Sequence, residues 1–264
     1  MKFGDKIVLI SGATGGMGEE IAKQLSREGC KLTLFARREE KLRELSDKIK
    51  TISDKTECIY KKCDVKKRED VKQAVEFVRN KFGRIDVAIL MAGILVPNPI
   101  ETFDSSIIID SMETNFFSNL YFIEHLLPIM KSQKSGTIAV TSTLPDKRGV
   151  PGWGAYGASK AAVSWLIESL RAEAKQKYNI NFITIKPGSV QTPMIENYYR
   201  KGAVHPKKAA EIIIKGIKKE KKIIQFPLSQ VLDIRATDMF PVIVYDSLPI
   251  ELRKGEDYPV VEDK

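Results

Sequence analysis

The chain has few of the residues that build disulfide frameworks and zinc sites. Its 264 residues include three cysteines and two histidines. Cys30, Cys58 and Cys63 form no C-x-x-C pair, and His125 and His205 are far apart in sequence. An odd number of unpaired cysteines is typical of a reducing compartment. Because these cysteines and histidines lack the close spacing of zinc ligands, we also expect no metal site.

Long apolar runs are also absent. The longest nearly unbroken run, Val87–Val96, includes a glycine and has about half the roughly 20 residues that a membrane-spanning helix needs. The first residues, Met1–Lys6, contain no apolar segment of the kind found in signal peptides. We therefore expect a cytoplasmic protein without a membrane span.

The charge is basic but mixed. There are 43 lysines and arginines against 34 acidic residues, a formal charge of +9, with 43% hydrophobic residues. The apolar content excludes disorder, and the charge suits a nucleic acid, an anionic membrane or a phosphorylated small molecule. The lysine runs alternate with acids or lie near expected helix ends, as on a solvated surface, and no nucleic-acid motif is present. We expect no nucleic-acid partner.

Short apolar segments alternate with amphipathic ones along the chain. The expected strands are Lys6–Ile10, Lys31–Ala36, Cys58–Cys63, Ile85–Met91, Thr137–Thr141, Asn181–Ile185 and Lys222–Phe226. Helical periodicity follows Gly18, recurs through Leu42–Ile52 and Val71–Phe82, and predicts helices over Asp104–Met130, Tyr156–Tyr178 and Pro206–Lys219. Buried strands joined by helices predict an α/β protein: one doubly wound domain over 1–264, with about seven mostly parallel strands and helices on both faces.

A glycine-rich turn follows the first expected strand. Gly12, Gly16 and Gly18 have the spacing G-x-x-x-G-x-G, which lets backbone N–H groups and a helix N-terminus approach a pyrophosphate. The spacing differs from the G-x-G-x-x-G fingerprint, and such a turn can also serve packing alone. Its place between strand and helix favours a dinucleotide.

The second expected strand ends in Arg37 and Arg38, where an acidic residue would bind an adenosine ribose diol. Two guanidinium groups there favour NADP(H) over NAD(H), because they can hold a 2′-phosphate. Alternatively, both are solvated residues paired with Glu39 and Glu40.

Tyr156 and Lys160 open a predicted helix. Their four-residue spacing puts phenol and ammonium on one face. A fixed cation lowers the pKa of a nearby phenol, so the pair can act in proton transfer, although the spacing alone is weakly specific.

These features occur in an order that resembles the short-chain dehydrogenase/reductase family, over roughly Lys6–Met194. The resemblance implies a Rossmann-type fold and a catalytic Tyr156 and Lys160, with Asn115 anchoring a water that links Lys160 to solvent. The cofactor residues that it implies, besides that pair and the arginines, are Gly12, Thr14, Gly15, Gly16, Met17, Gly18, Asp64, Val65, Ala92, Gly93, Pro187, Gly188, Val190 and Thr192.

The sequence departs from the family pattern in two features, the strand asparagines and the catalytic serine. Leu90 and Met91 replace the two strand asparagines, which removes polar contacts near the cofactor. The catalytic serine, expected 13 residues before the tyrosine, is Thr143, with Ser142 beside it. Because neighbouring strand residues face opposite sides, only one hydroxyl can serve; we favour Thr143, whereas a one-residue bulge would bring in Ser142.

The resemblance implies an oxidoreductase that transfers hydride between NADP(H) and a carbonyl or alcohol substrate. Asn115 alone could equally be a capping or exposed residue. The alternatives are a non-catalytic cofactor-binding protein of the same fold and, third, a basic nucleic-acid binder. The helix that carries Tyr156 has more apolar residues than one buried face requires, and members of the family commonly associate through their long helices. Together these predict a homodimer or homotetramer.

The substrate side is least determined. Residues 194–205 are the expected substrate-side loop, where Tyr198, Tyr199 and Arg200 could line a pocket or pack on the surface. The apolar segment Met239–Tyr245 could cap a substrate, join an oligomer interface or touch a membrane, with core packing as the default. We expect 249–264 to be a flexible tail.

Overall fold

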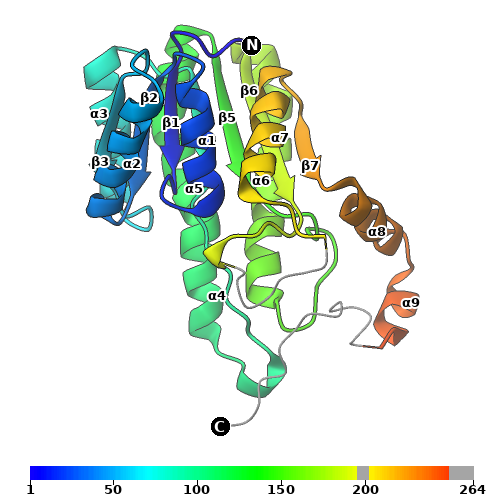
Figure 1. Ribbon diagram of the computed structural model, residues 1–264. Helices are drawn as coiled ribbons and strands as arrows, with labels where there is room; N and C mark the ends of the chain where they lie inside the picture. Colours follow the sequence, from blue (N-terminus) through cyan, green and yellow to red (C-terminus); the bar gives the residue numbers. More distant parts are fainter. Residues whose placement is uncertain (195–201, 250–264) are drawn as a thin grey trace.

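The computed structural model describes residues 1–194 and 202–249, and shows one α/β layer structure (Figure 1). The strands are β1 (Ile7–Ser11), β2 (Lys31–Ala36), β3 (Cys58–Lys62), β4 (Val87–Leu90), β5 (Gly136–Thr141), β6 (Ile180–Pro187) and β7 (Ile223–Phe226). The helices are α1 (Gly16–Ser26), α2 (Glu39–Ile52), α3 (Arg68–Phe82), α4 (Ser105–Met112), α5 (Ser118–Gln133), α6 (Gly154–Tyr178), α7 (Pro206–Lys218), α8 (Leu228–Asp238) and α9 (Val242–Ser247).

The seven strands form one sheet in the order β3-β2-β1-β4-β5-β6-β7, and every neighbouring pair is parallel. The predicted fold class is therefore confirmed. The strand order reverses between β1 and β4, and a crevice at the carboxyl ends of such strands is where ligands bind in this class of sheet.

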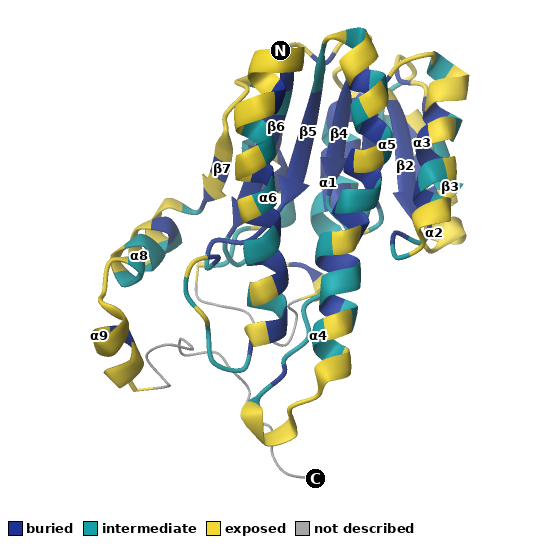
Figure 2. Cartoon of the chain, turned by 180° about the vertical axis from the view of Figure 1, so that it is seen from behind, coloured by how far each residue is buried: buried dark blue, intermediate teal, exposed yellow. Residues whose placement is uncertain are grey.

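Two hydrophobic layers hold the helices on the sheet. Val8 and Ile10 of β1 face the layer that includes α1, α2 and α7, whereas Ile7 and Leu9 face the layer that includes α3, α5 and α6. This is the alternation of side chains along a strand. Figure 2 shows the consequence: the strands are buried between helices whose outer faces are exposed.

The expected single helix over Asp104–Met130 is instead α4 and α5 joined by a π-helical turn, Glu113–Phe117. Asp104 caps α4 by accepting a hydrogen bond from the amide of Ser106 at 2.8 Å. A π-helical turn inserts an extra residue per turn and often lies at a functional site. Here it carries Asn115 towards the ends of the strands.

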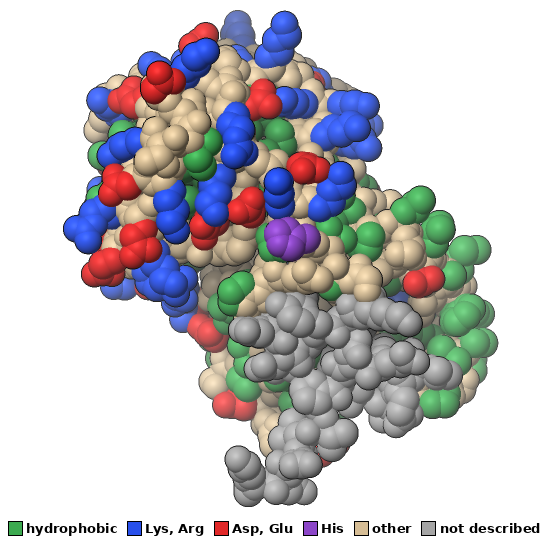
Figure 3. Space-filling view, in the orientation of Figure 1, with side chains coloured by type: hydrophobic (Ala, Val, Ile, Leu, Met, Phe, Trp, Pro, Cys, Tyr) green, Lys and Arg blue, Asp and Glu red, His purple; other side chains and the backbone are tan. Residues whose placement is uncertain are grey.

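The segment after β7 forms α8 and α9, which periodicity did not predict. The prediction that Met239–Tyr245 packs in the core is wrong for most of the segment. Met239 and Ile243 are 83% and 84% exposed, and of these seven residues only Tyr245 is buried. Figure 3 shows hydrophobic side chains gathered over α8 and α9, while lysines and arginines are spread among acids elsewhere on that face. No helix of the described residues is long and apolar enough to cross a membrane.

Candidate active site

The glycine turn lies at the carboxyl end of β1, against the end of β4. Gly12 has φ +65°, and a Cβ atom there would lie 2.7 Å from the amide nitrogen of Ala92. A Cβ atom on Gly18 would collide with the carbonyl oxygen of Gly12. No side chain caps α1, whose N-cap residue is Gly15, so its first-turn N–H groups have no side-chain partner. The turn can therefore admit a phosphate at close range.

The loop after β6 meets this turn from the other side. A Cβ atom on Gly16 would lie 2.8 Å from Cγ2 of Thr192, so the two segments are in contact. Gly188 donates its amide to the carbonyl of Phe226 at 2.8 Å, and Val190 pairs with Val204 in a short bridge. The loop that begins at Pro187 thus forms one wall of the crevice.

Arg37 and Arg38 are both exposed directly after β2. Among the described residues, no ion pair includes either guanidinium group, so the proposed pairing with Glu39 and Glu40 is not what the structure contains. Their donors are available to a ligand at this edge of the sheet.

Asp64 and Val65 follow β3 at the same edge. The side-chain carboxylate of Asp64 accepts a hydrogen bond from the backbone amide of Lys66 at 3.2 Å. The backbone amide of Asp64 donates to the carboxylate of Asp70 at 3.0 Å. These bonds form a tight turn, and Val65 is buried beside it.

The end of β4 brings Gly93 next to the predicted catalytic residues. A Cβ atom on Gly93 would lie 3.0 Å from Oδ1 of Asn115 and 3.3 Å from Nζ of Lys160. Of the two residues that replace strand asparagines, Leu90 is buried, whereas Met91 lines the cavity and accepts from the hydroxyl of Thr141.

Asn115 is fully buried and clamps the chain after β4. Its Oδ1 accepts from the amide of Ile94 at 2.8 Å, and its Nδ2 donates to the carbonyl of Ile94 at 3.0 Å and to Ser159 at 2.9 Å. The backbone carbonyl of Asn115 accepts from Asn119 at 2.6 Å. It is therefore neither exposed nor a helix cap, and its side chain joins the π-helical turn to the segment after β4 and to α6.

Lys160 extends from α6 into the protein interior. Its ammonium donates to the carbonyl of Thr141 at 2.9 Å and lies 5.9 Å from the centroid of the Tyr156 ring. Burial lowers the pKa of Lys160 to about 8. The cause is desolvation of a cation that has no described carboxylate partner.

The pKa of Tyr156 shifts opposite to the expected direction. Burial raises the pKa of the phenol, and a hydrogen bond from Thr143 partly opposes this rise. The expected lowering by Lys160 is not found, because the ammonium points to the carbonyl of Thr141 rather than to the phenolic oxygen. Removal of the phenol from water is thus the main influence on the pKa of Tyr156 when no ligand is bound.

The two candidate hydroxyls face opposite sides. Thr143 faces Tyr156 and the cavity. Ser142 is fully buried, where its Oγ donates to the carbonyl of Lys160 and lies 2.8 Å from Oγ of Ser164. The amides of Ser142 and Leu144 donate to the carbonyls of Ile185 and Pro187, which continues the pairing with β6 beyond Thr141 without a one-residue bulge at Ser142.

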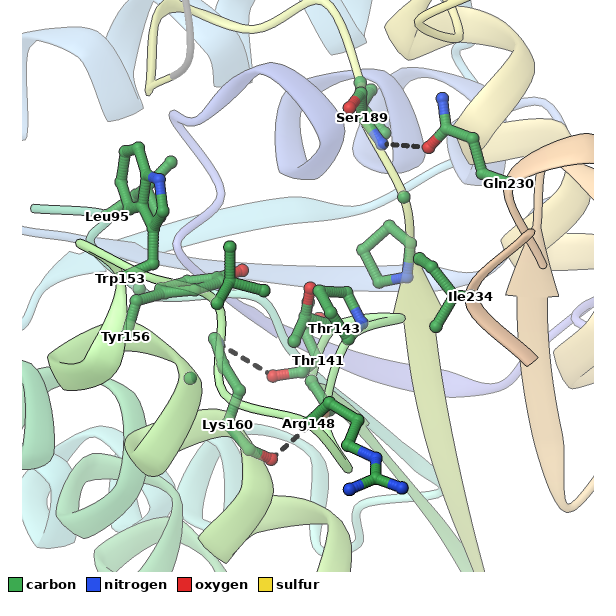
Figure 4. Close-up of a pocket in the computed structure, with 18 of the residues that line it drawn as sticks. Leu95, Thr141, Thr143, Arg148, Trp153, Tyr156, Lys160, Ser189, Gln230 and Ile234 are labelled. Carbon is green, nitrogen blue, oxygen red and sulfur yellow. Dashed lines mark hydrogen bonds between the residues drawn. The ribbon is translucent and has the colours of Figure 1, made fainter. Parts of the chain in front are cut away.

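These groups surround a cavity of about 670 Å³ (Figure 4). Tyr156, Thr143 and Lys160 line it at the strand ends. The apolar part of the lining is formed by Met17, Met91, Ile94, Leu95, Pro145, Val150, Trp153, Pro187, Val190, Met194, Ile234, Phe240, Tyr245 and Leu248, and Arg148, Gln230, Asp233 and Asp238 are among its polar residues.

Comparisons agree with this geometry. The sequence profile of the short chain dehydrogenases matches residues 6–202. The chain belongs to the short-chain dehydrogenase family. It is therefore an oxidoreductase of a fold that binds a nicotinamide cofactor.

Similar proteins include members with and without a described substrate. The chain is 36% identical over 230 residues to an uncharacterized oxidoreductase of Listeria innocua, covering 82% of this chain and 92% of that protein. Levodione reductase superposes with TM-score 0.81 at 25% identity, covering 87% and 99%. An alcohol dehydrogenase of the archaeon Thermococcus sibiricus, complexed with 5-hydroxy-NADP, gives 0.75 at 26% identity, covering 84% and 94%.

Capping of the cavity was one of the alternatives for Met239–Tyr245, and Phe240 and Tyr245 do line it, but sequence reasoning missed the contacts that hold this part of the dehydrogenase in place. Gln230 of α8 accepts from the amide of Ser189 at 2.9 Å. Arg148 donates to the carbonyls of Asp238 and Phe240 and lies 5.3 Å from the centroid of the Tyr245 ring. These contacts fasten α8 and α9 to the loops after β6 and β5. No periodicity marks them, because they join single residues across long stretches of chain.

The expected substrate-side loop is described only at its ends. Met194 lines the cavity, and Gly202 leads to Val204 and its bridge with Val190. Tyr198, Tyr199 and Arg200 lie outside the described residues, as does the expected tail from residue 250 onwards.

The burial of Lys160 predicts a pH-dependent cost in stability. The pKa falls from 10.5 to about 8 on folding, so the buried cation destabilises the fold below pH 8, and the loss disappears as pH rises towards 10.5. We expect Lys160→Met to raise the free energy of unfolding by about 1–3 kcal/mol at pH 7, and by much less at pH 10.5. Urea unfolding measures this difference. For the control Lys175→Met, at an exposed lysine of the same helix, the change in the free energy of unfolding should be about the same at pH 7 and pH 10.5. A Lys160→Met protein less stable than wild type at pH 7 would contradict this.

Proposed function

We propose that this short-chain dehydrogenase transfers a hydride between NADP(H) and a carbonyl or alcohol substrate, with Tyr156 as the general acid and base. The observation that carries the proposal is that Tyr156, Thr143 and Lys160 together line one cavity at the strand ends, with the ammonium of Lys160 5.9 Å from the centroid of the Tyr156 ring. A phenol, a hydroxyl donor and a cation are the groups that carbonyl reduction needs.

The cofactor residues fit a nicotinamide dinucleotide. The glycine turn, from Gly12 through Thr14 and Met17, and the uncapped start of α1 would hold the pyrophosphate, and the wall that begins at Pro187 would lie along the nicotinamide. Asp64 and Val65 would contact the adenine. When bound, the cofactor supplies or accepts the hydride.

The remaining chemistry belongs to the side chains of the protein. In reduction, Thr143 donates a hydrogen bond to the carbonyl oxygen as negative charge develops there, and Tyr156 delivers the proton to the same atom. In oxidation, the phenolic oxygen accepts that proton. Lys160 would hold the nicotinamide ribose through its ammonium, which lies in the cavity near the Tyr156 ring. Asn115 holds the chain after β4 through Ile94 and the first turns of α6 through Ser159, the residue before Lys160.

The apolar lining supports a substrate with a bulky hydrophobic body. Trp153, Phe240 and Tyr245 present aromatic surface, and Ile94 and Ile234 add aliphatic surface. We infer that a ketone or secondary alcohol of this kind enters between the loop after β5 and the α8–α9 segment. Small hydrophilic carbonyl compounds would leave this surface wet and bind weakly.

A non-catalytic cofactor-binding protein is the second candidate. Leu90 and Met91 favour it, because they remove polar contacts that the family has near the cofactor. A screen of ketones and alcohols with NADPH, NADP, NADH and NAD, read at the nicotinamide absorbance band, separates the two. Turnover of any compound supports the enzyme; binding of cofactor without turnover over a wide panel supports the second candidate.

The cofactor preference is testable at Arg37. The unpaired guanidinium groups of Arg37 and Arg38 support binding of a 2′-phosphate, as does the NADP analogue in the archaeal relative. We expect Arg37→Ala to weaken NADPH binding by about tenfold to hundredfold and to leave NADH binding unchanged. Fluorescence titration measures both.

The control is Arg43→Ala, which removes the same charge from an exposed site farther along α2. It should change NADPH affinity by less than about threefold, since exposed charges at that range are screened. If the wild-type protein binds NADPH and NADH with equal affinity, the proposed preference for NADP(H) is wrong.

The catalytic assignment is testable at Tyr156. We expect Tyr156→Phe to lower turnover by at least about 10²–10⁴-fold with NADPH binding nearly unchanged, because only the proton-transferring oxygen is lost. Turnover is measured from the change in nicotinamide absorbance, and NADPH binding is measured by fluorescence titration. Substantial turnover by Tyr156→Phe would overturn the assigned chemistry.

The neighbouring hydroxyls provide the matched pair. Thr143→Val should lower turnover on the order of 10²-fold, since the donor to the oxyanion is lost while the shape is kept. Ser142→Ala should have a much milder effect. The reverse order would assign the donor role to Ser142.

We also propose that the dehydrogenase is a homodimer or homotetramer formed through α4, α5 and α6. Trp165 of α6 is 80% exposed, and Ile109 and Phe117 add apolar surface on neighbouring elements. Light scattering at micromolar concentration should give a multiple of 29.7 kDa, and Trp165→Glu should shift it towards the monomer. A wild-type mass near 29.7 kDa would exclude the assembly.

A further inference from the structure

A buried ion pair lies behind the proposed catalytic residues. Lys186 on β6 pairs with Asp146 in the loop after β5, and their side chains are 9% and 1% exposed. No other ion pair of the described residues includes either one. Oδ2 of Asp146 receives the ammonium, whereas Oδ1 is buried and has no hydrogen-bond partner in the part of the chain that the structure describes. One carboxylate oxygen is thus the centre of a polar cluster inside the protein.

The same oxygen continues into a chain of hydroxyl groups. Ser164 on α6 donates to Oδ2 of Asp146, and its Oγ lies 2.8 Å from Oγ of Ser142. Ser142 in turn contacts the carbonyl oxygen of Lys160 at 2.8 Å. The chain therefore runs from the Lys186 ion pair to the backbone of the lysine beside Tyr156.

The ion pair sets the direction of these hydrogen bonds. A carboxylate only accepts, so the hydroxyl hydrogen of Ser164 is committed to Asp146. Ser164 is then an acceptor for Ser142, whose hydrogen serves both Ser164 and the carbonyl of Lys160. Without the carboxylate, Ser164 is free to turn its hydroxyl hydrogen towards Ser142, and the contact between the two serines no longer has a fixed direction.

The chain ends at the two places that decide the geometry of proton transfer. Ser142 directly precedes Thr143, whose hydroxyl faces Tyr156. The carbonyl of Lys160 is one helical turn from Tyr156 on α6. Fixing Ser142 against that carbonyl therefore fixes the end of β5 against the first turns of α6.

We propose that Lys186 and Asp146, acting through Ser164 and Ser142, are positioning residues that set the separation between the Thr143 hydroxyl and the Tyr156 phenol. This proposal rests on the proposed function for its kinetic consequence, but its structural consequence can be measured without turnover.

Stability alone gives little reason for such a pair. Desolvation of two charges offsets much of their attraction, and apolar replacements of buried pairs are often neutral or stabilising. A pair that orients a hydrogen-bonded chain at a reactive site has a different benefit, since a displacement of about 1 Å there can cost 10²-fold in rate.

Ser164→Ala is the test, because it interrupts the chain without uncovering a buried charge. We expect kcat to fall on the order of tenfold, with KM and the NADPH dissociation constant within about twofold of wild type. Crystal structures should show a longer Thr143 Oγ1 to Tyr156 Oη separation than in wild type. Ser169→Ala, at an exposed serine on the same helix, is the control and should match wild type in every measurement.

The ion pair itself is tested with its charge balance kept. Asp146→Asn alone leaves Lys186 buried without its counter-charge, and can fail to fold for that reason. The double variant Asp146→Leu/Lys186→Met removes both charges and the acceptor for Ser164, and should repeat the loss of kcat and the longer separation. Its melting temperature reports the structural contribution separately.

The outcomes separate this proposal from the proposed function. An unchanged Thr143–Tyr156 separation in Ser164→Ala overturns the positioning role, as does kcat equal to that of Ser169→Ala. A fall in melting temperature with kcat unchanged shows a structural role only and also overturns it. Absence of turnover in wild type defeats the proposed function, while the measured separation still decides the positioning role.

Discussion

The parallel direction of all seven strands is the constraint on which this site depends. Because every strand ends at the same edge of the sheet, residues that are far apart in sequence, such as Gly12, Gly93 and Thr143, meet there. The close contact of Gly12 with Ala92 leaves no room for a side chain at the reversal of strand order. The crevice therefore forms where the sheet topology opens it and where glycine permits a close approach.

Two buried lysines near this edge illustrate opposite solutions to the cost of desolvation. Lys186 has a carboxylate partner, whereas the hydrogen-bond partner of Lys160 within the described residues is a backbone carbonyl, and burial lowers the pKa of Lys160 to about 8. A cation that is weakly satisfied by the protein is available to a ligand, while a paired one is committed to the architecture. The difference in partners separates a binding role from a positioning role more clearly than residue type does.

Local pattern predicted much of the fold, since burial on both faces leaves a signal in each strand. The apolar runs around Val8 and Ile89 and the helical spacing of Val71 and Val75 mark buried strands and amphipathic helices. It did not predict α8, whose only buried residue is Val231, because a helix that buries one side chain has little periodicity. Nor did it predict the π-helical turn at Asn115, which depends on hydrogen bonds to Ile94 and Ser159 from other elements.

The sequence by itself determined the α/β class, the glycine turn and the one-face spacing of Tyr156 and Lys160, because each follows from residues close together in the chain. Only the tertiary structure decided that Thr143 faces the phenol while Ser142 faces Ser164, and that burial raises the pKa of Tyr156. It also decided that Arg148 and Gln230 fasten α8 and α9 over the cavity. These outcomes depend on desolvation and on contacts between distant segments, and neither quantity exists until the chain has folded.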